Sequence, residues 1–160
     1  MQEASRELIE GLPSGFRKAA VPLVGAHPTL CHHDLHRRNL FVQGVGAARE
    51  IVFIDWQLVQ AVPGVRDLSF LVGCEGGGLS AGQEQSLLRR YHRGLIANGV
   101  AGYSFEQAIE EYRRSIICDF GRMVMTASNP GIAEAMWEQL AVQLRNRADA
   151  VERWDLLALL

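Results

Sequence analysis

Two short apolar segments joined by a glycine-containing turn most limit how this chain can fold. Residues 40–43 are Leu-Phe-Val-Gln and residues 50–54 are Glu-Ile-Val-Phe-Ile, with Gly44-Val45-Gly46 between them. Apolar runs bounded by glycine in this way predict the two strands of a β-hairpin. Asn39 lies just before the first strand and Asp55 just after the second. Antiparallel pairing would therefore bring Asn39 and Asp55 to the same end of the hairpin.

The rest of the chain carries mainly helical patterns. Residues 80–83 and 104–107 each place Ser at the N-cap and Gln three residues later, which is the capping-box pattern of a helix start. The first of these helices is expected to end at Asn98-Gly99, and the second continues with apolar residues at spacings of three and four. We also expect helices at 3–11 and 16–23, after Pro63-Gly64, and from Pro130 to about Trp154. The 160 residues are thus predicted to form a single, mostly helical α+β domain.

The polar segment before the hairpin contains the residues that suggest chemistry. It is His32-His33-Asp34-Leu35-His36-Arg37-Arg38-Asn39, which fits the pattern H-x-D-x-x-x-x-N, and Ile54-Asp55-Trp56 follows the second strand. Phosphoryl transfer needs a carboxylate that accepts a hydroxyl proton, and amide and carboxylate oxygens that coordinate Mg²⁺. Asp34 suits the first role, and Asn39 with Asp55 suits the second.

These motifs resemble the C-terminal lobe of the aminoglycoside phosphotransferase and choline-kinase-like superfamily, which is related to protein kinases. The catalytic loop of that superfamily is roughly H-G-D-L-H-x-x-N, and its metal motif is I-D-F or I-D-W. Its next landmark is Gly or Pro followed by D-L at a helix start, and the segment Pro63-Gly64-Val65-Arg66-Asp67-Leu68 fits it. The resemblance extends over about residues 25–75, and the later helices match only in kind.

The resemblance implies a kinase-like fold and a phosphotransferase activity. The γ-phosphoryl group of ATP or GTP would pass, with Mg²⁺, to a hydroxyl of a small molecule such as an aminoglycoside or a choline-like alcohol. Asp34 would be the catalytic aspartate, His32 would orient the loop, and Asn39 and Asp55 would bind Mg²⁺. Asp67 is expected to be a structural cap.

Acidic groups on the C-terminal helices serve cationic acceptors in this superfamily. Asp119 and Glu75 are therefore candidate substrate-binding residues, with Glu110 and Glu111 as weaker ones. For each of them, a place on a solvated helix face is the alternative. Asp119 is the best single candidate because Cys118 and Phe120 flank it in a largely apolar stretch.

Part of a kinase-like enzyme is not recognisable in the sequence. We find no glycine-rich phosphate loop, strand lysine or adenine-binding hinge, so we expect a catalytic lobe without its N-terminal nucleotide-binding lobe, inactive alone. The surface that would meet that lobe should be partly apolar and exposed, which favours self-association or a partner chain. The alternative function is a non-catalytic ligand-binding or regulatory module derived from the lobe.

Other interpretations of single residues remain open. His32, His33, Asp34 and His36 could form a Zn²⁺ or Fe site of a metal hydrolase. Asn39 and Asp55 could be plain turn residues at strand ends. Cys31 could be a nucleophile, although a buried thiol is the simpler expectation. Gly76-Gly77-Gly78 lacks the spacing and lysine of a phosphate-binding loop, which favours a linker.

Two positions depart from the family pattern. His33 stands where glycine is usual, and Gln57 stands where a protein kinase has the glycine of D-F-G. Both substitutions are compatible with the small-molecule branch of the superfamily, but His33 is expected to affect the loop.

Composition limits the partners and the compartment. The formal net charge is −2 and no basic tract is interleaved with aromatics, so neither nucleic acid nor a membrane surface is expected as a partner. No apolar run approaches the ~20 residues of a membrane span, and the first ten residues lack the apolar core of a signal peptide. Three scattered cysteines without C-x-x-C indicate reduced thiols. We therefore expect a cytoplasmic protein.

Overall fold

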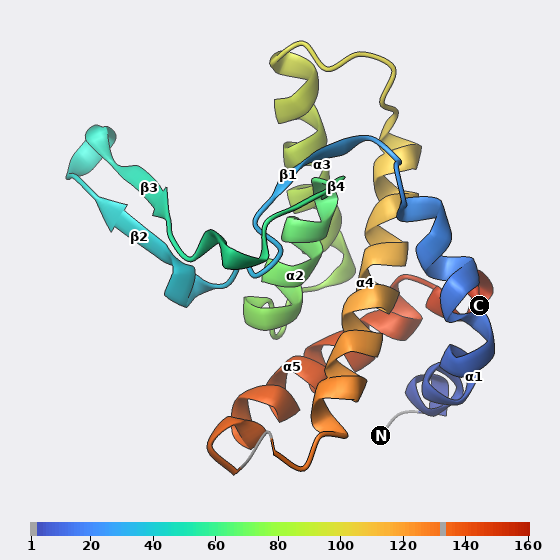
Figure 1. The fold of residues 1–160 in the computed structure, drawn as a ribbon. Helices are drawn as coiled ribbons and strands as arrows, with labels where there is room; N and C mark the ends of the chain where they lie inside the picture. Colours follow the sequence, from blue (N-terminus) through green and yellow to red (C-terminus); the bar gives the residue numbers. More distant parts are fainter. Residues whose placement is uncertain (1–2, 132–133) are drawn as a thin grey trace.

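The computed structural model describes residues 3–131 and 134–160 as a helical body from which a β-hairpin projects (Figure 1). The helices are α1 (Glu3–Ala20), α2 (Val65–Glu75), α3 (Ala81–Ala97), α4 (Phe105–Ala127) and α5 (Glu134–Arg153). The strands are β1 (Pro28–Cys31), β2 (Leu40–Gln43), β3 (Glu50–Phe53) and β4 (Gln60–Pro63). Short 3-10 turns join several of these elements, and one of them, η5 (Leu156–Leu159), ends the chain. The predicted α+β, mostly helical fold class is confirmed.

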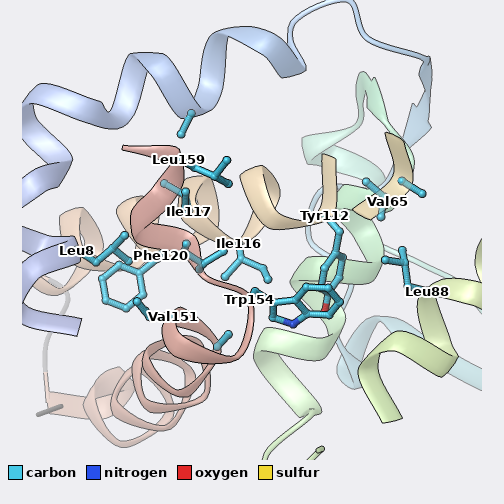
Figure 2. Packing of buried hydrophobic residues seen from close by; sticks show 14 of the residues in the cluster. Leu8, Val65, Leu88, Tyr112, Ile116, Ile117, Phe120, Val151, Trp154 and Leu159 are labelled. Carbon is cyan, nitrogen blue, oxygen red and sulfur yellow. The ribbon is translucent and has the colours of Figure 1, made fainter. Parts of the chain in front are cut away.

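Helix α4 is the centre of the body and packs against all four other α-helices. Its apolar face is buried, as its three- and four-residue spacing predicts, and contributes Tyr112, Ile116 and Phe120 to the main core. Leu8 of α1 and Val151 of α5 close this core from two sides (Figure 2). The long helices therefore form a rigid platform, and the loops at its edge carry the polar motifs.

The β2–β3 hairpin is paired as the sequence predicts. Leu40 faces Phe53 and Gln43 faces Glu50 in an antiparallel ladder, and the pairing continues where the Ile54 amide donates to the Asn39 carbonyl at 3.1 Å. The hairpin points away from the helices in Figure 1 and makes its main contacts within itself and with the 3-10 turn Arg37–Asn39. Most of its apolar side chains are exposed on both faces.

A second two-stranded sheet was not predicted. β1 and β4 pair in antiparallel register from Pro28 opposite Pro63 to Cys31 opposite Gln60. In sequence, β1 precedes and β4 follows the polar loop and the β2–β3 hairpin, so their pairing brings together the two ends of the segment between residues 31 and 60. Sequence patterns do not indicate this pairing. β1 begins at a proline, β4 ends at one, and neither strand alternates clearly between apolar and polar residues.

Two helix boundaries differ from expectation. The predicted break at Pro13 is wrong, because α1 continues through it to Ala20. A proline inside a helix removes one backbone hydrogen bond, and burial of Leu8, Leu12 and Ala19 on one face offsets that loss. The predicted helix start at Pro130 is wrong, because Pro130 and Gly131 form a turn in which Asn129 Oδ1 accepts the Gly131 amide, and α5 is described from Glu134. Residues 132 and 133 of the predicted helix lie outside the described residues.

The two capping boxes and the helix end at Asn98-Gly99 are confirmed. Ser80 and Ser104 each accept the backbone amide of the Gln three residues later, and each Gln side chain accepts the serine amide in return. Within the described parts of the chain, no helix combines the length and apolar character needed to cross a bilayer.

Candidate active site

His32 fixes the start of the loop that joins β1 to β2. Its side chain is buried, and Nε2 donates to the Ile54 carbonyl at 2.6 Å while Nδ1 accepts the Asp34 amide at 3.3 Å. Both contacts fit one neutral tautomer of the ring. The imidazole thus ties the loop to the end of β3, which is the orienting position expected for it. With both nitrogens engaged, His32 has no lone pair left for a metal ion.

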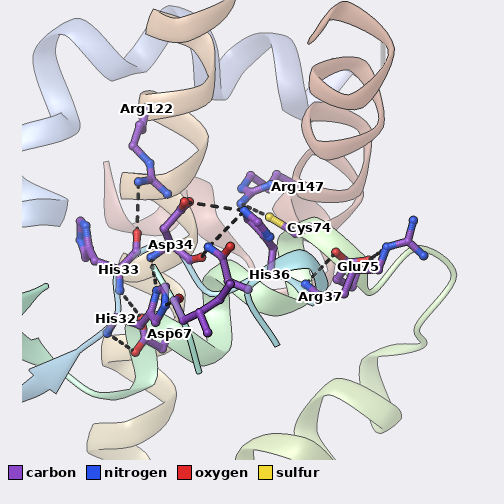
Figure 3. Close-up of polar contacts among 12 residues, drawn as sticks. His32, His33, Asp34, His36, Arg37, Asp67, Cys74, Glu75, Arg122 and Arg147 are labelled. Carbon is purple, nitrogen blue, oxygen red and sulfur yellow. Dashed lines mark hydrogen bonds and ion pairs between the residues drawn. The ribbon is translucent and has the colours of Figure 1, made fainter. Parts of the chain in front are cut away.

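Asp67 holds the loop from the opposite side. Its two carboxylate oxygens accept the backbone amides of His32 and His33, each at 2.7 Å. Asp67 lies in the first turn of α2, so the helix carries this carboxylate to the loop (Figure 3). Asp67 is thus a cap, as expected, but it caps the catalytic loop rather than the end of its own helix.

The backbone at His33 explains why the superfamily has glycine there. The φ angle of His33 is +65°, in the left-handed region that glycine enters without cost and other residues enter with strain. Burial lowers the pKa of the His33 imidazole, with Arg66 and Arg122 acting in the same direction. The strained backbone at His33 is held by the Asp67 carboxylate, which accepts the His33 amide.

Asn39 and Asp55 lie at the same end of the hairpin, as the sequence predicts. The Asn39 amide nitrogen donates to the Asp34 carbonyl at 3.0 Å, which leaves its Oδ1 without a protein hydrogen bond among the described residues. Asp55 is exposed and has φ +64° and ψ +59°, a left-handed conformation that aspartate tolerates better than most residues. One amide oxygen and one carboxylate, neither hydrogen-bonded among the described residues, therefore lie at the same end of the paired strands β2 and β3.

A cavity of about 310 Å³ opens beside Asp34, between the loop and helices α4 and α5. Its walls are formed by Asp34, His36, Arg38, Phe70, Arg122, Met123, Thr126, Met136, Gln139, Leu140 and Gln143. Of these described side chains, Asp34 is the one carboxylate, and two are guanidinium groups. About a quarter of the Asp34 side chain remains exposed, so a molecule in the cavity can reach its carboxylate.

The two predicted substrate-binding carboxylates have other neighbours. Asp119 is buried, accepts the Ser69 hydroxyl at 3.0 Å, and lies 3.6 Å from an Arg66 nitrogen and 3.9 Å from an Arg122 nitrogen. Asp119 does not line the cavity beside Asp34. Glu75 accepts the Arg37 amide at 3.2 Å and lines a neighbouring cavity of about 380 Å³, which shares Arg38 and two glutamines with the first.

Two further residues near the loop have distinct roles. His36 places Nε2 at 3.6 Å from a carboxylate oxygen of Asp34, so it adjoins the candidate base, a contact that sequence reasoning did not anticipate. Cys31 is fully buried with its thiol directed at the Val62 and Pro63 carbonyls. Burial and the nearby Asp67 carboxylate raise the pKa of this thiol to about 11, so it is not a thiolate nucleophile at neutral pH.

The sequence pattern of the ecdysteroid kinase-like family matches residues 2–101, which include the loop, both sheets and helix α2. The chain belongs to this family. The ecdysteroid kinase-like family is part of the protein-kinase-like and choline-kinase-like superfamily, so the predicted relationship is confirmed at that level. No curated protein and no solved structure matches the chain.

Membership of the ecdysteroid kinase-like family implies small-molecule phosphotransferase chemistry that uses a nucleotide and Mg²⁺ in general. Among the described residues, no three His, Cys, Asp or Glu side chains are grouped so that they could hold a metal ion. The donors at the hairpin end suit Mg²⁺ nevertheless, because this ion takes one or two protein oxygens and completes its shell with phosphates and water.

Proposed function

We propose that this chain provides the catalytic half of a kinase that phosphorylates a hydroxyl of a small molecule. One observation carries the proposal: Asp34 borders a ligand-sized cavity, and its backbone carbonyl accepts the side chain of Asn39, which lies with Asp55 at one end of the hairpin. A hydroxyl compound in the cavity and a metal–nucleotide complex at the hairpin end would then meet at the same loop.

Asp34 is the candidate general base. Its carboxylate would accept the proton of the acceptor hydroxyl as the oxygen attacks the γ-phosphorus. Oδ1 of Asn39 and the Asp55 carboxylate would hold Mg²⁺, which when bound neutralises charge on the phosphates. His32 and Asp67 position the loop through the contacts described above, and the loop in turn orients the base.

The cavity indicates what kind of acceptor fits. Apolar side chains from α4, α5 and Phe70 form much of its wall, and its described charges are two guanidinium groups against the one carboxylate of Asp34. Such a site repels a polycation, which argues against an aminoglycoside or a choline-like cation as acceptor. A neutral alcohol fits better, with apolar groups against Phe70, Met123, Met136 and Leu140 and polar groups for the polar residues of the wall. The family description names ecdysteroids, which makes a steroid-like alcohol the first class to test.

The other side of the nucleotide is expected to come from a second unit. The single lysine of the sequence is Lys18 of α1, whose side chain donates to the carbonyl of Leu160. It is not part of the site. The hairpin and its flanks expose many apolar residues, distributed over both faces of the hairpin: Phe41, Val42, Val45, Ile51, Ile54, Trp56, Leu58 and Val59. An apolar surface of this extent next to the metal ligands suits the docking of a nucleotide-binding lobe, or of a second copy of the chain.

Phosphate transfer is the direct test of this function. The purified chain is mixed with Mg-ATP or Mg-GTP and a panel of steroid alcohols, with an aminoglycoside and choline for comparison, and phosphorylated product is measured by mass spectrometry. We expect no multiple turnover by the chain alone and phosphorylated steroid alcohol once a nucleotide-binding lobe of the same family is supplied. Failure to phosphorylate any hydroxyl compound with the lobe present would reject the proposal, and sustained turnover by the chain alone would reject the need for a second unit.

A further inference from the structure

Arg122 has binding capacity that the protein itself does not use. It projects from α4 into the wall of the cavity beside Asp34, and about a third of its side chain is exposed. Its polar contacts are long: Nη1 donates to the His33 carbonyl at 3.4 Å, and Nη2 lies 3.9 Å from Asp119. Its Nε is buried without a hydrogen-bond partner among the described residues. Of the five donors of a guanidinium, one N–H of Nη1 is used and Nε is buried, which leaves three on Nη1 and Nη2 without a hydrogen bond among the described residues.

The surroundings fix this guanidinium in place. It lies over the Phe70 ring with 4.3 Å between the Arg122 Cζ atom and the ring centroid, which holds the plane of the group against an apolar wall of the cavity. Figure 3 shows Arg122 reaching from its helix to the loop at His33. Little rotational freedom would be lost when a ligand binds to a group that is already oriented in this way.

Charge around Arg122 is not balanced by the protein. Asp119 is the one carboxylate that pairs with it among the described residues, and the same oxygen lies closer to Arg66. Arg147 is buried nearby on the same Phe70 ring, with the Cys74 sulfur and the Gln143 carbonyl as its partners. Arg147 does not line this cavity, but Arg38 does, so two guanidinium groups face the one carboxylate of Asp34 and the wall favours an oxygen with negative or partial negative charge.

We propose that Arg122 determines acceptor specificity by binding a carbonyl or carboxylate oxygen of the alcohol, remote from the hydroxyl that faces Asp34. The proposal rests on the proposed function, because it takes the Asp34 cavity to be the acceptor site. A contact with the transferred phosphoryl group is the competing role. We favour the acceptor because Arg122 lies on the α4 side with Phe70, Met123 and Thr126, whereas Asp55 ends the hairpin.

Binding measurements without nucleotide test this role. Three probes share one hydroxylated steroid skeleton: one carries a remote ring ketone, one a remote carboxylate, and one neither. Isothermal titration calorimetry compares the unmodified chain with Arg122→Gln, Arg122→Lys and Arg90→Gln. Arg90 is an exposed arginine of α3 that does not line the cavity, so its variant controls for the loss of one charge.

We expect the unmodified chain to bind the ketone or the carboxylate probe about 10- to 100-fold more tightly than the bare probe, the range of a hydrogen bond to a charged group. Arg122→Gln should abolish this preference and Arg90→Gln should keep it. Arg122→Lys retains the charge near Asp119 and should lose the ketone preference while keeping part of the carboxylate preference, so it serves as the test if Arg122→Gln does not fold. Thermal denaturation checks the fold of each variant.

Several outcomes would overturn the inference. Equal binding of the three probes to the unmodified chain, no binding of any probe, or an equal loss for all three in Arg122→Gln would each do so. With the nucleotide-binding lobe added, an equal fall in kcat for every acceptor in Arg122→Lys would assign the residue to the phosphoryl group instead. If the preference depends on Arg122 but no phosphate is ever transferred, the proposed kinase function fails and the Arg122 site stands.

Discussion

Asp67 Oδ1 accepts the backbone amide of His33 at 2.7 Å, and this amide belongs to a residue held at φ +65°. The two facts are connected. A left-handed backbone costs a non-glycine residue roughly 1–2 kcal/mol, so it persists only where other contacts enforce it. The carboxylate of Asp67 provides that enforcement, and the peptide planes around Asp34 are oriented as a result.

Asp67→Asn should loosen the catalytic loop. An asparagine has the same shape, but its NH₂ group cannot accept the second amide, and a charged hydrogen bond of this kind contributes about 1.5–3 kcal/mol. We expect a loss of that size in the free energy of unfolding, measured by urea denaturation. Asp155→Asn, at an exposed aspartate, is the control and should change stability by much less. Equal effects of the two substitutions would contradict the role of Asp67.

His33→Gly should be more stable than His33→Ala. Both variants remove the imidazole, and they differ in the cost of φ +65°, which alanine pays and glycine does not. The expected difference is about 1 kcal/mol in favour of glycine, although glycine gives more freedom to the unfolded chain. Thermal melts of the two variants measure it. Alanine being the more stable would show that the left-handed backbone at residue 33 is not enforced in solution.

Cys31 should make the chain less stable at high pH. The pKa of the thiol is about 11 when folded, against an ordinary value of 9.0. The folded state therefore retains a proton that the unfolded state loses, so this contribution is complete below pH 9 and disappears as the pH rises toward 11. Over that interval the unmodified chain should lose roughly 2–3 kcal/mol more stability than Cys31→Ala. Parallel pH profiles of the two chains would contradict this.

Asp55→Ala should abolish Mg²⁺-dependent nucleotide binding without unfolding the chain. The side chain is exposed, so its loss leaves no cavity, while one of the two protein ligands disappears. Nucleotide titrations with and without Mg²⁺ measure the effect. Glu50→Ala, at the far end of the same hairpin, should leave it unchanged. Unaltered Mg²⁺ dependence in Asp55→Ala would remove this residue from the metal site.

Asp34→Asn should affect turnover far more than ligand binding. The substitution keeps the size of the side chain but removes the general base, a loss of about 10²- to 10⁴-fold in kcat. The assay uses the enzyme completed by a nucleotide-binding lobe, and nucleotide affinity is measured in parallel. Near-normal turnover would show that Asp34 is not the base.

Local signals in the sequence predicted those parts of the fold that local forces decide. The Ser80 and Ser104 capping boxes and the 40–54 hairpin are examples, because each is specified by residues within a few positions of one another. The pairing of β1 with β4 and the unbroken α1 depend instead on distant partners. Leu160, for instance, packs against Gly15 of α1, a contact that no window of sequence reveals.

In the candidate site too, sequence predicted the residues that belong to local motifs and missed those that depend on distant partners. The H-x-D-x-x-x-x-N motif identified Asp34 and Asn39, and the hairpin correctly predicted that Asp55 would lie near Asn39. Arg122 was missed because it belongs to no motif and lies far along the chain from the loop it meets. The sequence offered one indication of its role: Arg122 lies next to Met123, a buried residue of α4.

The projecting hairpin has a consequence for how tightly a metal–nucleotide complex can bind. β2 and β3 rest mainly on each other, so they should open more often than the helices, and their amide hydrogens should exchange sooner. Asn39 is buried at the edge of the body, while Asp55 sits at the root of the hairpin. A metal–nucleotide complex that needs both the Asn39 and the Asp55 oxygen would bind only while the hairpin is closed. Its apparent affinity would therefore fall as the fraction of time that the hairpin is open rises. A partner that docks on the apolar hairpin would therefore be expected to strengthen metal binding without touching the metal.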